Sequence, residues 1–167
     1  MERTLDSTVL HIARTRLVND YPGQIAACLD ALGEDQIWWR PNEQANSVAN
    51  LLLHLSGSNR YYFGHIIAGQ PDARDRDAEF AARGGHSKTE VTRVWRETVS
   101  LVDEVLGGLQ PSRLMETTDR TGKQTTYAQV VLHVTHHNAV HVGQIIYITK
   151  QLNAGALDDI WMKMRAR

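Results

Sequence analysis

Apolar residues recur along most of the chain at intervals of three and four residues, which is the period of one face of an α-helix. Four segments carry this pattern, and no segment of useful length alternates apolar and polar residues as a strand would. We therefore expect an all-α protein. The helices are expected at about 4–32, 47–69, 87–108 and 126–152.

Local signals indicate where the first two helices begin and end. A Pro-Gly pair at Pro22 interrupts the first, so we expect a kink or a break near Tyr21. Gly33 then supplies a C-terminal stop. The second helix is expected to begin at Asn46 or Ser47, because either side chain can accept a hydrogen bond from a free N–H of the first turn.

The third and fourth helices open with the same signature. Ser87 is followed by Glu90, and Thr126 is followed by Gln129, each three residues later. Both pairs fit a capping box, in which the hydroxyl and the longer side chain each take one unpaired backbone N–H. These signals predict helix starts at 87 and 126.

Four helices of roughly 20 residues or more are each about 30 Å long, which suits a four-helix bundle. The connection at 69–86 is unusually long. At up to ~3.4 Å per residue it can run the length of the bundle and make the second and third helices parallel. A second long connection, at 110–125, is a competing place for a crossover, but we favour the first. With no repeat or linker, residues 1–167 are expected to form a single domain.

The fourth helix carries a continuous row of inward-facing positions that includes two histidines. Imidazoles four residues apart stand one turn above each other, with Cβ atoms about 5–6 Å apart. Both can then reach one metal ion at ~2.0–2.1 Å. The alternative is that both are core histidines bonded to protein neighbours. The row consists of Tyr127, Val130, Val134, His137, His141, Ile145, Ile148 and Leu152.

A third ligand is needed, because two histidines alone hold a metal weakly, and in a bundle it should come from a facing helix. His54 lies in the most apolar part of the second helix. Its angular position borders the inward face, so periodicity permits His54 without selecting it. The remaining histidines are poorer candidates because of their face, their distance along the axis or their position in a loop. They are His11, His65, His86, His133 and His136.

Composition excludes several classes of function. The formal net charge is -1, from 18 Lys+Arg and 19 Asp+Glu, which gives no electrostatic footprint for nucleic acid or an anionic membrane. The apolar stretches are far shorter than the ~18 residues that span a bilayer, and the N-terminus is too polar for a signal peptide. Cys28 is the single cysteine, so no disulfide forms within the chain and a cytoplasmic location is expected.

Several motifs, taken together and in this order, resemble the DinB/YfiT-like superfamily, and within it a branch of uncharacterised bacterial proteins. The similarity covers nearly the whole chain. The motifs are Trp38-Trp39-Arg40-Pro41-Asn42, the segment 46–57 (Asn-Ser-Val-Ala-Asn-Leu-Leu-Leu-His-Leu-Ser-Gly), Arg74-Asp75-Arg76-x-x-Glu79-Phe80 and His137-x-x-x-His141-x-Gly143-Gln144-Ile145.

The resemblance implies a four-helix bundle with the crossover favoured above, often as a homodimer. It also implies a divalent metal held by three histidines, which by motif are His54, His137 and His141. Val142 departs from the family pattern, because a basic residue is frequent at that position. This departure puts a charge there in doubt, but not the metal.

Three imidazole ligands leave coordination positions open, as in catalytic sites, and zinc, nickel, manganese and iron are all compatible with them. Characterised relatives include transferases and isomerases that use low-molecular-weight thiols such as bacillithiol or mycothiol, and a proposed hydrolase. We therefore expect a metal-dependent enzyme for thiol-dependent transfer or hydrolysis of a small molecule, with catalytic residues unassigned. The alternative is a non-catalytic metal-binding or stress-response module whose metal is structural.

Some residues near these motifs have two interpretations. The charges at 72–79 suit a solvated crossover, but Arg76 and Glu79 can instead reach the site or a partner subunit. Gln144 can orient a ligand histidine or lie at the surface. Gly143 in a helix interior costs roughly 1 kcal/mol relative to alanine, which suggests close approach of another helix or subunit.

Three further features are given an expected role. Ser58 and Tyr61 follow His54 on its face of the second helix and are the nearest candidates for substrate contacts. The aromatic run 38–41 is expected to plug the end of the bundle. Residues 163–167 form a small basic tail, which we expect to be frayed and solvated.

Overall fold

The computed structural model describes residues 4–157 and confirms the all-α class. The predicted basic tail at 163–167 and the ends of the predicted domain lie outside the described residues. No helix in the described part of the chain is long and apolar enough to cross a membrane. The elements are α1 (Leu5–Arg14), α2 (Tyr21–Ala31), α3 (Val48–Asn59), α4 (Arg76–Ala81), α5 (Lys88–Gly108), β1 (Thr117–Thr118), β2 (Thr125–Thr126) and α6 (Tyr127–Leu152).

Two of the four helical columns combine an α-helix with a π-helical segment. Thr15–Asp20 joins α1 to α2, and Arg60–Ile67 extends α3. The column is not broken at Tyr21, because Asp20 and Tyr21 keep right-handed helical dihedral angles. Pro22 falls in the first turn of α2, where the missing N–H of proline is tolerated.

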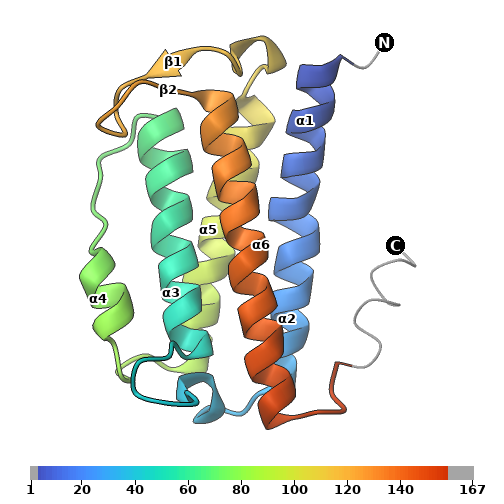
Figure 1. Ribbon diagram of the computed structural model, residues 1–167, viewed down its shortest axis with the longest axis vertical. Coiled ribbons are helices and arrows are strands. Elements are labelled where there is room, and N and C mark those ends of the chain that lie inside the picture. The colour runs from blue at the N-terminus through green and yellow to red at the C-terminus, as the bar shows by residue number, and fades with distance from the viewer. Residues whose placement is uncertain (1–3, 158–167) are drawn as a thin grey trace.

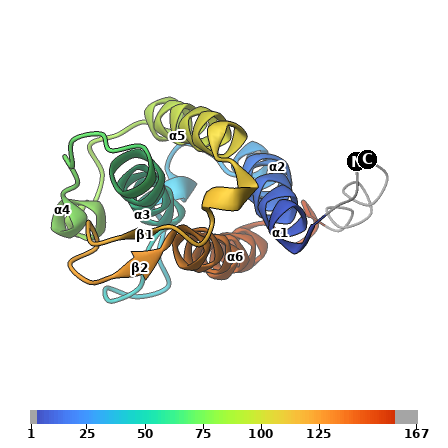
Figure 2. The same ribbon diagram turned by 90° about the horizontal axis from the view of Figure 1, so that it is seen from above.

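The four columns form a bundle in which α3 and α5 point the same way (Figure 1). Seen from above, α3, α5, the α1–α2 column and α6 follow one another around the bundle (Figure 2). The connection between α3 and α5 carries the short α4 and runs along the outside of α3, as predicted for a crossover. The second long connection closes the upper end with a small antiparallel ribbon, β1 paired with β2.

The predicted helix starts are confirmed by their hydrogen bonds. Ser47, rather than Asn46, caps α3, and it forms a capping box with Asn50. The capping boxes at the starts of α5 and α6 also form, with Glu90 and Gln129 as their longer side chains. Each long helix after the first therefore begins where its local sequence satisfies the free N–H groups of the first turn.

The core of the described residues divides into two apolar clusters, one in each half of the bundle. On three of the four columns, a buried polar residue lies between a residue of one cluster and a residue of the other. On α6, for example, Asn138 lies between Val134 and Val142. The residues of this polar layer are Asn59, Thr98 and Asn138. On the α1–α2 column, Tyr21 packs against both clusters.

A pair of buried amides in this layer joins α3 to α6. Asn59 Nδ2 donates to Asn138 Oδ1 at 3.1 Å, and Asn138 Nδ2 donates to Asn59 Oδ1 at 2.8 Å. Each side chain is 1% exposed, so water cannot replace either bond. The pair fixes the height of α6 relative to α3, and thereby which residues of the two helices face each other.

The amide pair predicts a non-additive effect on stability. Asn138→Leu leaves the amide of Asn59 buried without a partner and should lower the free energy of unfolding by about 1–3 kcal/mol. The double variant Asn59→Leu/Asn138→Leu should cost less than the sum of the single changes, because it leaves no amide unpaired. Urea unfolding of metal-free protein measures both, with exposed Asn19→Leu as the control. Strictly additive costs would contradict the pairing.

Candidate metal centre

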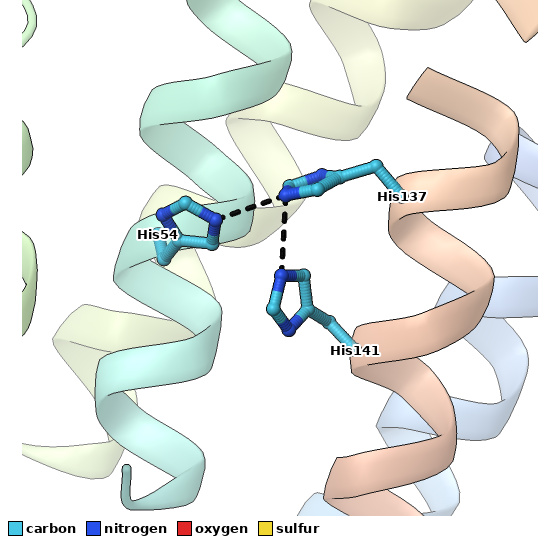
Figure 3. A group of neighbouring side chains, drawn as sticks. All are labelled: His54, His137 and His141. Atoms are coloured by element: carbon cyan, nitrogen blue, oxygen red, sulfur yellow. Dashed lines mark hydrogen bonds between the residues drawn. The ribbon is translucent and has the colours of Figure 1, made fainter. Parts of the chain in front are cut away.

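Three imidazole rings meet between α3 and α6 (Figure 3). His54 Nε2 lies 3.0 Å from His137 Nε2, and His141 Nε2 lies 3.1 Å from the same atom. One ring nitrogen of each residue lies within 4.8 Å of the other two. Among residues 4–157, this is the one group of three or more histidine, cysteine or acidic side chains close enough to hold a metal ion.

The outer nitrogens of two rings are fixed by hydrogen-bond acceptors. His54 Nδ1 lies 3.0 Å from the carboxylate oxygen Oε2 of Glu79, and His141 Nδ1 lies 2.7 Å from the amide oxygen of Gln144. Because these oxygens only accept, each Nδ1 carries the proton and donates it. Arg74 Nη2 also lies 3.2 Å from His54 Nδ1, but it donates over the shorter distance of 2.9 Å to Glu79 Oε2. Neutral His54 and His141 therefore present the lone pair of Nε2 to the centre of the group.

This arrangement leaves the three inner nitrogens short of protons. His137 Nε2 contacts both neighbouring lone pairs, but it can donate at most one proton. At least one contact then sets two lone pairs against each other. A divalent cation bound by all three nitrogens would remove this conflict. Two nitrogens that share an ion at ~2.0–2.1 Å lie no more than about 4.2 Å apart, and both observed contacts satisfy this limit.

His137 is kept neutral by its surroundings. Burial lowers its pKa to about 3, and the nearby His141, His54, His133 and Arg74 act in the same direction. Its Nδ1 is buried and has no hydrogen-bond partner among residues 4–157. Burial also lowers the pKa of His141, although its bond to Gln144 opposes the shift. Neutral imidazoles are the form that binds metals, so the donor set fits a metal ion.

The crossover supplies an ion pair directly behind His54. Arg74 Nε donates to Glu79 Oε1 at 2.8 Å, and Arg74 Nη2 donates to Glu79 Oε2 at 2.9 Å. Burial opposes ionisation of Glu79, but the bonds from Arg74 and His54 outweigh it and lower the pKa of this carboxyl group. The expectation of a solvated crossover is wrong for this pair, because the side chains are 14% and 9% exposed.

The other candidates near the site have mixed outcomes. Glu79 does reach the site, whereas the guanidinium of Arg76 stands over the ring of Phe80, 5.0 Å from its centre. Phe80 in turn packs against His54, with ring centres 4.5 Å apart. Gln144 orients a histidine, as one of its two interpretations proposed. Arg74 was not identified as a site residue from the sequence.

Some expectations made from position along the helices are wrong. Ser58 is buried, so it is not available for substrate contacts. A Cβ added to Gly143 would meet no other atom within 4 Å, so no other helix of the described residues approaches it closely, and approach of another subunit stays a prediction. Val142, where relatives of the superfamily often have a basic residue, packs in the apolar core. Only part of the aromatic run 38–41 covers the core as expected, because Trp38 packs on the core and Trp39 is exposed.

Three hollows adjoin residues of the site, and their volumes suit small ligands. One, of about 410 Å³, lies between α3 and the crossover and is walled partly by Arg74 and Glu79. A second, of about 380 Å³, is lined by His133, whose ring stacks on that of His137. A third, of about 540 Å³, is lined by Gln144. Tyr61 lines the first two hollows and remains a candidate for substrate contacts.

The crossover between parallel α3 and α5 and the overall architecture place this protein among the DinB-like four-helix bundles. Its fold is similar to that of a DinB-like protein, YjoA, from Bacillus subtilis, with a TM-score of 0.64 and 14% sequence identity over 84% of this chain and 91% of that chain. The chain belongs to the family described as "Protein of unknown function (DUF1572)", whose family model matches residues 6–164. No curated protein matches it. The resemblance drawn from the sequence is confirmed at the level of family and fold.

Proposed function

We propose that this protein binds one divalent metal ion through His54, His137 and His141 and acts as a metal-dependent enzyme. The observation that carries the proposal is the convergence of three Nε2 atoms, two of which present lone pairs because Nδ1 is held by Glu79 or Gln144. Protein groups alone leave these inner nitrogens unsatisfied, whereas a metal ion satisfies all of them at once.

The protein's own residues supply orientation and a neutral donor set. Glu79 and Gln144 hold two rings in place, and burial keeps His137 neutral. A metal held by three protein ligands retains open positions, where it can act as a Lewis acid or acidify a bound water or thiol. The neighbouring hollows offer room for a small-molecule substrate, and the superfamily resemblance favours thiol-dependent transfer or hydrolysis. Zinc, nickel, manganese and iron all remain compatible with histidine ligands.

Metal content tests the ligand set. Untagged protein should contain about one equivalent of divalent metal by elemental analysis, because the three inner nitrogens form one site. His54→Ala, His137→Ala and His141→Ala should each lose most of it. The matched controls are His133→Ala and His136→Ala, which remove exposed histidines from the same helix and should retain the metal. Metal that persists in His54→Ala, or a wild-type protein that cannot be loaded, would refute the site.

An exogenous thiol distinguishes a catalytic site from a structural one. If coordination positions are open, 2-mercaptoethanol added to the cobalt-loaded protein should bind the metal and produce a thiolate-to-cobalt absorption band. The band should saturate with thiol concentration and should be absent in the cobalt-treated His141→Ala variant. A cobalt spectrum unchanged by thiol, cyanide or azide would instead indicate a closed shell and the structural role of the metal.

We also propose that the protein is a homodimer, as the resemblance implies, and that it is cytoplasmic, as its single cysteine led us to expect. α6 exposes an apolar row on its outer face, in which Leu132, Val140 and Tyr147 are 55%, 48% and 65% exposed, and Gly143 leaves room for close approach. Sedimentation equilibrium should find a dimer that Val140→Lys converts to a monomer, with helical content unchanged. A wild-type monomer at every concentration would exclude this assembly.

A further inference from the structure

We infer that Glu79 is a positioning residue for His54 and that the crossover is therefore part of the metal centre. This inference rests on the proposed metal-binding function and assigns roles to three residues outside the ligand set. Glu79 accepts the proton of His54 Nδ1, Arg74 holds the carboxylate through two bonds, and Gly57 provides the space in which the carboxylate lies.

The backbone that carries Glu79 is fastened to α3 independently of its side chain. Asn50 Nδ2 donates to the carbonyl oxygens of Glu79 and Ala82, at 2.9 and 3.0 Å. Arg40 Nη2 donates to Asn50 Oδ1 at 3.0 Å, which orients that amide. The end of α4 is thus held one helical turn below His54 by a buried residue of α3. A backbone segment that is fixed by these hydrogen bonds therefore places the carboxylate beside His54.

Gly57 shows how closely the carboxylate approaches α3. A Cβ built at this position would overlap Glu79 Oε1 and would stand 2.8 Å from the carboxyl carbon and 3.3 Å from Arg74 Nε. Any side chain here must therefore displace the ion pair. A glycine inside a helix costs roughly 1 kcal/mol relative to alanine. The space that Gly57 leaves for the ion pair is a physical reason why α3 has a glycine at this position.

The three histidines receive unequal support from their surroundings. His54 donates to a carboxylate and His141 to a neutral amide, whereas Nδ1 of His137 has no partner in the described part of the chain. A carboxylate on the outer N–H fixes the ring and makes the imidazole a stronger ligand, and such partners commonly change metal affinity about 10- to 100-fold. The crossover therefore sets how strongly His54 would bind a metal ion. By linkage, metal binding must in turn stabilise the attachment of the crossover.

Variants of Glu79 test this role. Zinc affinity is measured by competition with a chromophoric chelator for wild type, Glu79→Ala, Glu79→Gln and Gly57→Ala. Glu79→Ala should weaken zinc binding about 10- to 100-fold, and Glu79→Gln should weaken it less, because the amide oxygen can still accept the Nδ1 proton. Gly57→Ala should resemble Glu79→Ala. The matched control is Glu116→Gln, which alters an exposed carboxylate paired with Arg113.

A second readout separates positioning from general loss of structure. Nitrogen-15 spectra of the histidine rings report which nitrogen carries the proton. In metal-free wild type, His54 should be protonated at Nδ1, and Glu79→Ala should populate the other tautomer, with partial recovery in Glu79→Gln. Wild-type zinc affinity in Glu79→Ala, or an equal loss in Glu116→Gln, would overturn this inference alone. Failure of wild type to bind zinc would overturn both proposals.

Discussion

The candidate metal centre depends on a layer of buried polar groups that lies between the two apolar clusters of the bundle. Buried polar groups must find partners, and few arrangements of two helices allow each amide both to donate and to accept. The Asn59–Asn138 pair meets this requirement. A shift of α6 by one turn would separate the two amides, and it would leave only one of His137 and His141 at a height where its ring faces His54. The pairing that stabilises the interface is therefore the constraint that aligns the site.

The amides and the imidazoles obey the same rule with different results. Each asparagine carries both donors and an acceptor, so the pair satisfies itself. A neutral imidazole carries one of each, and the outer nitrogens of His54 and His141 have already used their donors. The inner lone pairs then face one another within the protein. Such a local conflict in a well-satisfied interior is expected at a functional site, where the missing partner comes from outside the chain.

The residues of this centre that follow from helical period could be predicted from the sequence. The residues whose place depends on the path of the crossover could not. The spacing of His137 and His141, the helix caps and the long crossover are all local patterns, and the structure has them. His54 bordered the inward face, so periodicity alone could not select it. Arg74 and Glu79 lay in a charge run typical of a solvated loop. Gly57 lies where the ion pair approaches α3, but a glycine in a helix does not by itself reveal which residues come close.

Topology explains why the crossover with its short helix α4, and not the fourth column of the bundle, contacts His54 from behind. Because α3 and α5 are parallel, the chain must return along the whole bundle between them, and it does so over the outer side of α3 (Figure 2). The neighbours of α3 within the bundle are α5 and α6, and α6 already contributes the other two histidines. A short connection would leave Nδ1 of His54 without a carboxylate. The crossover that defines this fold thus also supplies the carboxylate that would make His54 a stronger ligand for a metal ion.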